Sequence, residues 1–224
     1  MHRTLTDPVP ARLHLPKEWT EGSPVLVLLH GRGSSEGDLQ GLQVVLPTSW
    51  ALLTPRAPFP GPPWGYGPGW AWYRYVAEDR VVPETLEKSL DFLDDLLDNL
   101  PEILGGTPGD LVLGGFSQGG TTSLAHALTR PGRLKGVVTL SGFLPQVPVV
   151  TDGLSGAGGL PVFWGHGQAD PAIPFSLGVR GRTALREAGA DVTEVDHPGG
   201  HTITPQEARL LGQWLTDRTT TGED

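Results

Sequence analysis

The chain has 224 residues, of which 16 are basic and 25 acidic, and its net charge is −9. This length suits one α/β domain with a full core, and a hydrophobic content of 38% is too high for a disordered chain. The negative charge argues against nucleic-acid partners and anionic membrane surfaces, because binding phosphates needs the opposite sign. The chain has no cysteine, which excludes disulfides and thiolate nucleophiles.

No stretch of the sequence resembles a targeting or membrane-spanning segment. The first sixteen residues lack the apolar core of a signal peptide, and the longest strongly apolar run, residues 25–29, is far shorter than the ~20 residues of a membrane span. The sequence therefore predicts a cytoplasmic protein with no stable membrane association.

Apolar runs of strand length alternate with helix-patterned stretches along the chain, which is typical of a parallel α/β sheet. In chain order, the predicted strands are residues 11–15, 25–29, 50–54, 110–116, 134–140, 161–164 and 192–196. The continuous apolar runs among them suit strands that are covered on both faces. In the first strand apolar and polar residues alternate instead, so we expect it near an edge of the sheet.

The leucine spacing between residues 83 and 104 predicts a long amphipathic helix. Intervals of four and three residues place these leucines on one buried face. The leucines concerned are Leu86, Leu90, Leu93, Leu97 and Leu100. Pro101 should kink this helix or end it early.

The last predicted helix begins at a capping box. Thr204 is the N-cap, Pro205 takes the first helical position and Glu207 lies three residues after the cap. Residues 219–224 are expected to form a disordered tail. Residues 1–218 are therefore predicted to be a single domain.

A G-x-S-x-G motif, Gly115-Phe116-Ser117-Gln118-Gly119, follows a predicted strand and opens a helix. This is the context of a nucleophile elbow, in which a serine lies on a strained strand-to-helix turn and the flanking glycines leave room for it. The motif is common by chance, so a glycine-rich turn without catalytic function is the alternative for the motif taken alone.

A serine nucleophile needs an imidazole base, and usually a carboxylate that fixes the tautomer of that base. Asp170 and His201 follow two later strands, so both are expected at the carboxyl edge of the sheet together with Ser117. Their order along the chain, serine, acid and histidine, is the order of the α/β-hydrolases. His197 is the alternative base, and the alternative acids are Asp152, Asp191 and Asp196.

The glycine-rich turn after residues 25–29 is predicted to complete an oxyanion hole. The backbone N–H groups of Arg32 and Gln118 are the predicted donors. A tight chain reversal is the alternative interpretation of this turn. The remaining candidate histidines, His30, His126 and His166, are expected to have structural roles.

Residues 55–73 combine a Gly/Pro-rich loop with three tryptophans and two tyrosines. A long irregular segment of this kind indicates a functional lid or disorder, and the aromatic rings argue against disorder. Because the segment follows a strand, we expect it to form a wall of the substrate pocket, with packing onto the sheet as the alternative for each ring. The predicted pocket residues are Trp70, Trp72, Phe143 and Leu144, which favour short-chain or aromatic acyl groups.

Five segments in the order LLHGRGSS, GFSQGG, SGFLP, HGQAD and GGHTI resemble the carboxylesterase/phospholipase group of α/β-hydrolases, which includes the acyl-protein thioesterases. The resemblance covers nearly the whole chain. It implies the α/β-hydrolase fold, with a mostly parallel central sheet and helices on both faces. It also implies Ser117, Asp170 and His201 as nucleophile, acid and base, and Arg32 and Gln118 as oxyanion donors.

The leading hypothesis is a serine carboxylesterase that acts on small esters. No cofactor and no metal are expected, since no spacing of His, Asp and Glu residues resembles a ligand set. A thioester, a lysophospholipid or a lactone is the alternative substrate of the same residues. A binding protein on a hydrolase fold is the non-enzymatic alternative, and a homodimer is left open.

Overall fold

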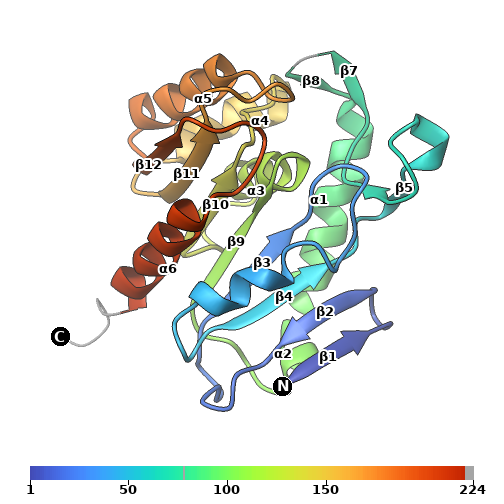
Figure 1. Ribbon diagram of the computed structural model, residues 1–224, viewed down its shortest axis with the longest axis vertical. Helices are drawn as coiled ribbons and strands as arrows, with labels where there is room; N and C mark the ends of the chain where they lie inside the picture. Colours follow the sequence, from blue (N-terminus) through green and yellow to red (C-terminus); the bar gives the residue numbers. More distant parts are fainter. Residues whose placement is uncertain (78, 220–224) are drawn as a thin grey trace.

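The computed structural model describes residues 1–77 and 79–219. Eight strands form one sheet in the order β1-β2-β4-β3-β9-β10-β11-β12 (Figure 1). The strands from β4 to β12 in this order pair in parallel, whereas β2 pairs antiparallel with both β1 and β4. The bounds are β1 His2–Leu5, β2 Ala11–His14, β3 Val25–Leu29, β4 Ala51–Pro55, β9 Leu111–Phe116, β10 Gly136–Leu140, β11 Pro161–Gly167 and β12 Asp191–His197.

Every strand that the sequence predicts lies in this sheet: residues 25–29 match β3 in full, and the ends of the other strands differ by at most three residues. The predicted first strand, β2, lies one position from the edge, and the edge itself is β1. Residues His2 to Leu5 are mostly exposed and carry no apolar run, which is why the apolar pattern misses them.

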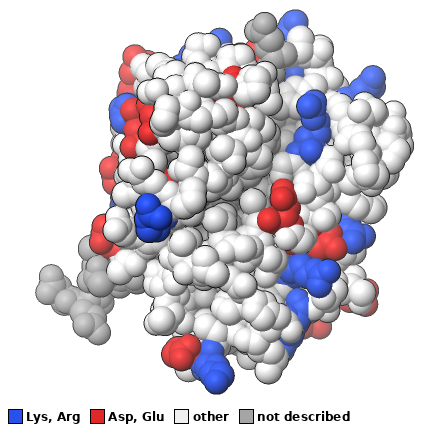
Figure 2. Space-filling view, viewed as in Figure 1, with Lys and Arg blue, Asp and Glu red and all other residues white. Residues whose placement is uncertain are grey.

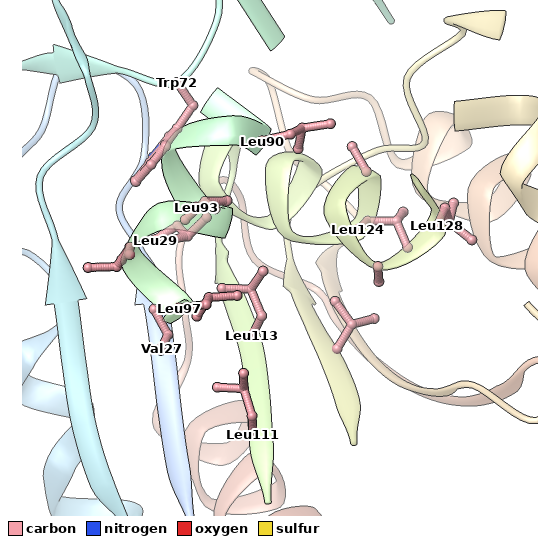
Figure 3. Close-up of a cluster of buried hydrophobic side chains, with 14 of the residues drawn as sticks. Val27, Leu29, Trp72, Leu90, Leu93, Leu97, Leu111, Leu113, Leu124 and Leu128 are labelled. Atoms are coloured by element: carbon pink, nitrogen blue, oxygen red, sulfur yellow. The ribbon is translucent and has the colours of Figure 1, made fainter. Parts of the chain in front are cut away.

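Side chains that alternate along each strand divide the core into two layers, one on each face of the sheet. Val25, Val27 and Leu29 of β3 pack in one cluster with leucines of the helices, and Leu26 and Leu28 pack in the other. Figure 3 shows Val27 and Leu29 of the first cluster together with Leu93 and Leu97. The first layer is covered by α1 Pro83–Asp98, α2 Leu100–Leu104, α3 Gln118–Thr129, α4 Pro148–Gly153 and α5 Phe175–Glu187. The second is covered by α6 Pro205–Thr219 and the short 3-10 helix Gln40–Val45. The prediction of helices on both faces is confirmed.

The helix predicted over residues 83–104 is two helices, α1 and α2, which meet at Asn99. Pro101 lies in the first turn of α2, where its missing N–H leaves no helical hydrogen bond unmade. The five leucines of the predicted stripe are at most 4% exposed. Proline therefore breaks the helix without breaking the buried face.

The segment predicted as a Gly/Pro-rich loop contains short regular elements. β5 Phe59–Pro60 pairs antiparallel with β6 Trp70–Ala71, and the 3-10 helix Pro62–Trp64 lies between them. A second small hairpin, β7 Tyr75–Ala77 and β8 Arg80–Val81, follows directly. These two hairpins project beyond the carboxyl ends of the central strands (Figure 1).

The capping box at the start of α6 is confirmed. The Thr204 N–H donates to Glu207 Oε2 over 3.2 Å, and the Glu207 N–H donates to Thr204 Oγ1 over 3.1 Å. Burial raises the pKa of Glu207 to about 7. The predicted tail begins inside α6, which continues to Thr219, and its remaining residues, 220–224, lie outside the described residues. The single-domain boundary stays a prediction.

Of the helices in residues 1–77 and 79–219, none combines the length and the apolar character that crossing a bilayer requires.

Candidate active site

Ser117 occupies a strained turn between β9 and α3. Its backbone has φ 54° and ψ −117°, a region that side-chain-bearing residues rarely adopt. A Cβ on Gly119 would lie 2.0 Å from the Leu29 carbonyl oxygen, and one on Gly115 would lie 2.5 Å from that same oxygen. The Ser117 N–H donates to the Leu140 carbonyl over 2.7 Å, which fixes the turn to β10. A larger residue at either position would therefore clash with the backbone, so both positions need glycine, as the elbow interpretation predicts.

Asp170 and His201 follow β11 and β12 and form a hydrogen-bonded pair. His201 Nδ1 lies 2.7 Å from Asp170 Oδ2, while Asp170 Oδ1 accepts the N–H groups of Ala172 and Ile173 over 2.8 and 2.9 Å. Burial alone would raise the pKa of Asp170, but these hydrogen bonds outweigh it and lower the pKa below its usual value. An ionised carboxylate only accepts, so Nδ1 carries the proton and Nε2 of His201 keeps a free lone pair.

The alternative acids have other partners or positions. Arg182 binds both carboxylate oxygens of Asp196 over 2.6 and 2.9 Å, and Arg218 binds Asp191 over 2.8 Å. Asp152 lies exposed in α4. Of the candidate acids, Asp170 is the one that contacts His201.

The alternative histidines are held inside the fold. The Nδ1 atom of His197, the alternative base, accepts the Gly199 N–H over 3.2 Å. Nδ1 of His30 lies 2.7 Å from the Gly31 carbonyl, and its Nε2 accepts the Ala57 N–H over 3.1 Å. His166 bonds to the Ile173 carbonyl of its own loop, and His126 pairs with Asp94. Each of these histidines has a structural contact, as the sequence predicts for all but His197.

Ser117 and His201 share the wall of one cavity of about 450 Å³. The Phe116 ring packs on the His201 ring with centroids 4.6 Å apart. Within the described part of the chain no hydrogen bond joins the Ser117 hydroxyl to His201, and such bonds are often long before substrate binds. The cavity lining is Gly31, Arg32, Ser34, Asp38, Tyr75, Phe116, Ser117, Ala172, Ile173 and His201.

Residues 17–217 match the Phospholipase/Carboxylesterase family. The chain belongs to this family. It is 32% identical over 152 residues to a probable carboxylesterase of Oryza sativa subsp. japonica, a match that covers 66% of this chain and 62% of the rice protein. It is 30% identical over 218 residues to acyl-protein thioesterase 1 of Cryptococcus neoformans, covering 86% and 91% of the two chains.

A comparison of structures gives the same family. The fold is similar to that of Zea mays acyl-protein thioesterase 2, with a TM-score of 0.74, 26% sequence identity and coverage of 93% of this chain and 98% of the maize chain. The α/β-hydrolase fold predicted from the sequence is confirmed. As a member of the phospholipase/carboxylesterase family, the chain is a hydrolase of ester bonds.

The two predicted oxyanion donors come from two segments next to Ser117: Gln118 follows it in the chain, and a Cβ on Gly31, the neighbour of Arg32, would lie 3.7 Å from the Ser117 Cβ. Arg32 follows β3 and lines the cavity, and Gln118 is the first residue of α3. Among the described residues neither backbone N–H has a hydrogen-bond acceptor. The buried Gln118 side chain accepts the Trp72 N–H over 2.8 Å and donates to the Tyr73 carbonyl over 2.7 Å, so it ties the aromatic segment to the elbow.

The predicted pocket wall is wrong for Trp72, Phe143 and Leu144, which belong to the core. Trp72 and Phe143 are 0% exposed and Leu144 is 4% exposed. The Trp72 indole donates to the His30 carbonyl over 2.9 Å and packs on Phe92.

Trp70 is not among the lining residues of the cavity either. Its backbone pairs with Ser34, and its ring stacks against Arg56. The cavity is lined instead by residues that the sequence interpretation missed, namely Ser34, Asp38, Tyr75, Phe116, Ala172 and Ile173. Phe116, Ala172 and Ile173 could have been predicted as lining residues, because they lie within three residues of Ser117 or Asp170 in the chain.

No group of three or more His, Cys, Asp or Glu side chains within residues 1–77 and 79–219 is arranged to hold a metal ion.

Proposed function

We propose that the protein is a serine carboxylesterase with Ser117 as nucleophile, His201 as base and Asp170 as acid. The observation that carries this proposal is the His201–Asp170 pair, with its 2.7 Å hydrogen bond, in one cavity with a serine on a strained elbow. A binding protein would have no need for this backbone strain, which costs about 1–3 kcal/mol.

The first half of the reaction forms an acyl-enzyme. Ser117 Oγ attacks the ester carbonyl while His201 Nε2 takes its proton, and Asp170 stabilises the imidazolium that results. The backbone N–H groups of Arg32 and Gln118 donate to the oxyanion of the tetrahedral intermediate. His201 then protonates the leaving alcohol oxygen as its bond to the carbonyl carbon breaks.

Water completes the reaction. His201 Nε2 takes a proton from a water molecule as this water attacks the acyl carbon, and the second tetrahedral intermediate collapses to release the carboxylic acid and return the proton to Ser117. Every proton in the cycle passes through His201 Nε2, so the scheme needs no group other than the residues named and the backbone amides.

We propose small carboxylic esters as substrates. At about 450 Å³ the cavity lies toward the lower end of the ~300–1,000 Å³ range of small-molecule sites. With Trp72 in the core, the expected preference for short or aromatic acyl groups rests on this size alone. A thioester or lysophospholipid is the alternative substrate of the same three residues. The cytoplasmic location and the homodimer stay predictions.

A substrate panel tests the proposal. We expect para-nitrophenyl acetate to hexanoate to be hydrolysed with a higher kcat/KM than the palmitate ester, and with a higher kcat/KM than an acyl thioester or a lysophospholipid. Highest activity on the palmitoyl ester or the lysophospholipid would contradict the proposed substrate class. Absence of hydrolysis across the panel by folded protein would contradict the proposed activity.

A further inference from the structure

The Arg32 side chain lies in the wall of the candidate active-site cavity. Arg32 is exposed, and it lines the same cavity as Ser117 and His201. Its guanidinium lies over two aromatic rings, 4.9 Å from the centre of Tyr66 and 5.3 Å from the centre of Tyr75. The proposed oxyanion hole uses only the backbone N–H of this residue, so its side chain has no part in the reaction described above.

The two tyrosines form a fixed platform beneath the guanidinium. The Tyr75 N–H donates to the Tyr66 hydroxyl oxygen over 2.8 Å, and the Tyr75 ring packs on the buried Phe143. Gly33 has φ +76°, and a Cβ there would lie 2.3 Å from the Tyr66 carbonyl oxygen, so the two loops are in close contact. Cation–π contacts with both rings therefore hold the guanidinium at the cavity.

Among the residues that the structure describes, no carboxylate forms an ion pair with Arg32. No Asp or Glu oxygen within residues 1–77 and 79–219 lies within 4.0 Å of its guanidinium nitrogens. Two other arginines with aromatic contacts differ in this respect, because Arg56 binds Glu36 over 2.7 Å and Arg182 binds Asp196 over 2.6 Å. An arginine fixed in a pocket wall without a counter-ion is suited to bind an anion of the ligand.

The overall charge of the protein does not attract anions. The net charge is −9, and on the face in Figure 2 basic and acidic side chains are intermixed rather than gathered in one basic patch. Asp38 is the acidic side chain of the cavity lining, and Arg32 is its basic side chain of fixed charge. A monoanion matches the single charge of Arg32, whereas a dianion such as a phosphate monoester would be repelled more strongly by Asp38.

We infer that Arg32 selects esters that carry a carboxylate besides the ester group. The inference rests on the proposed esterase function and defines its substrate class more narrowly. The carboxylate binds the guanidinium while the ester carbonyl faces Ser117. It can belong to the acyl part or to the alcohol part of the ester, and the test below distinguishes the two.

Two matched substrate pairs test this inference. The alcohol-side pair is para-acetoxybenzoate and its methyl ester, and the acyl-side pair is monophenyl adipate and its methyl ester. We expect one pair to show a higher kcat/KM for the anionic member in the wild-type enzyme. Arg32→Gln should lower the ratio of anionic to neutral kcat/KM for that pair about ten- to hundredfold, because it removes a charge-assisted hydrogen bond. Arg32→Lys should retain part of the ratio, and added salt should lower it.

Arg12→Gln is the matched control, because it changes the net charge equally but lies on β2 and lines a different cavity. It should leave the ratio unchanged. The inference is wrong if neither pair favours the anion, if Arg32→Gln slows both members of a pair equally, or if Arg12→Gln lowers the ratio as much.

A binding measurement separates this inference from the proposed activity. Calorimetry with para-hydroxybenzoate and adipate monomethyl ester should show tighter binding to the wild type than to Arg32→Gln for at least one carboxylate. Binding of this kind by a protein without esterase activity would support the anion site and contradict the proposed function. Hydrolysis of the neutral esters without any difference in carboxylate binding would overturn the anion site alone.

Discussion

Replacing Ser117 by alanine should lower kcat on a short-chain ester by about 10⁶-fold, because no acyl-enzyme can form without the hydroxyl. Asp170→Asn should cost less, about 10⁴-fold, because an amide at this position no longer fixes the His201 tautomer or stabilises the imidazolium. Steady-state kinetics with para-nitrophenyl acetate measures both. Thermal unfolding of each variant establishes that the loss is chemical rather than structural.

Asp152→Asn is the matched control for the acid, since Asp152 is an exposed carboxylate of α4 and a rival acid in the sequence interpretation. It should keep wild-type kcat. If Asp152→Asn were as inactive as we expect of Asp170→Asn, or if Ser117→Ala kept more than about a hundredth of the wild-type rate, the assignment of the three residues would be wrong.

Trp72→Ala should be strongly destabilising, by about 3–5 kcal/mol, because it empties the site of a fully buried ring. The side chain is 0% exposed, packs with His30 and Phe92, and donates a 2.9 Å hydrogen bond to a buried carbonyl. For a domain of this size the melting temperature should fall by roughly 6–20 °C. Denaturant unfolding measures the free energy directly.

Trp70→Ala is the comparison for Trp72, because its ring is only half buried and packs against Arg56. We expect a smaller loss of stability there. Both variants should keep the wild-type order of activities across ester chain lengths, since neither ring lines the cavity. A Trp72→Ala protein with nearly unchanged stability and an altered chain-length preference would show that Trp72 lies in the pocket after all.

The proposed catalytic residues could be located from the sequence because each lies in a short local motif. The elbow around Ser117 is defined by glycines within two residues of it, and their spacing reflects contacts with Leu29 and within the turn. Asp170 and His201 each follow a strand that is recognisable by its apolar run. Parallel strands bring their carboxyl ends to one edge, so local patterns sufficed to place all three residues there.

The pocket wall was not predictable in this way, because it depends on contacts between distant segments. Whether Trp72 turns inward or toward the cavity is decided by Gln118, 46 residues away, which binds the Trp72 backbone, and by the His30 carbonyl. An aromatic residue beside a proline-rich loop gives the same local pattern in both cases. Tyr75, which does line the cavity, lies in a three-residue strand with no distinctive pattern.

Reaction with a fluorophosphonate followed by peptide mass mapping tests the central claim most directly, because such a probe forms a covalent bond only with an activated serine. We predict one label per chain, on the peptide that contains Ser117. Ser117→Ala should not be labelled, and Asp170→Asn should be labelled much more slowly than the wild type. Ser34 is the other serine of the cavity lining and therefore the competing candidate. A label on Ser34 or on any other serine in active wild-type protein, or no label at all, would contradict the account.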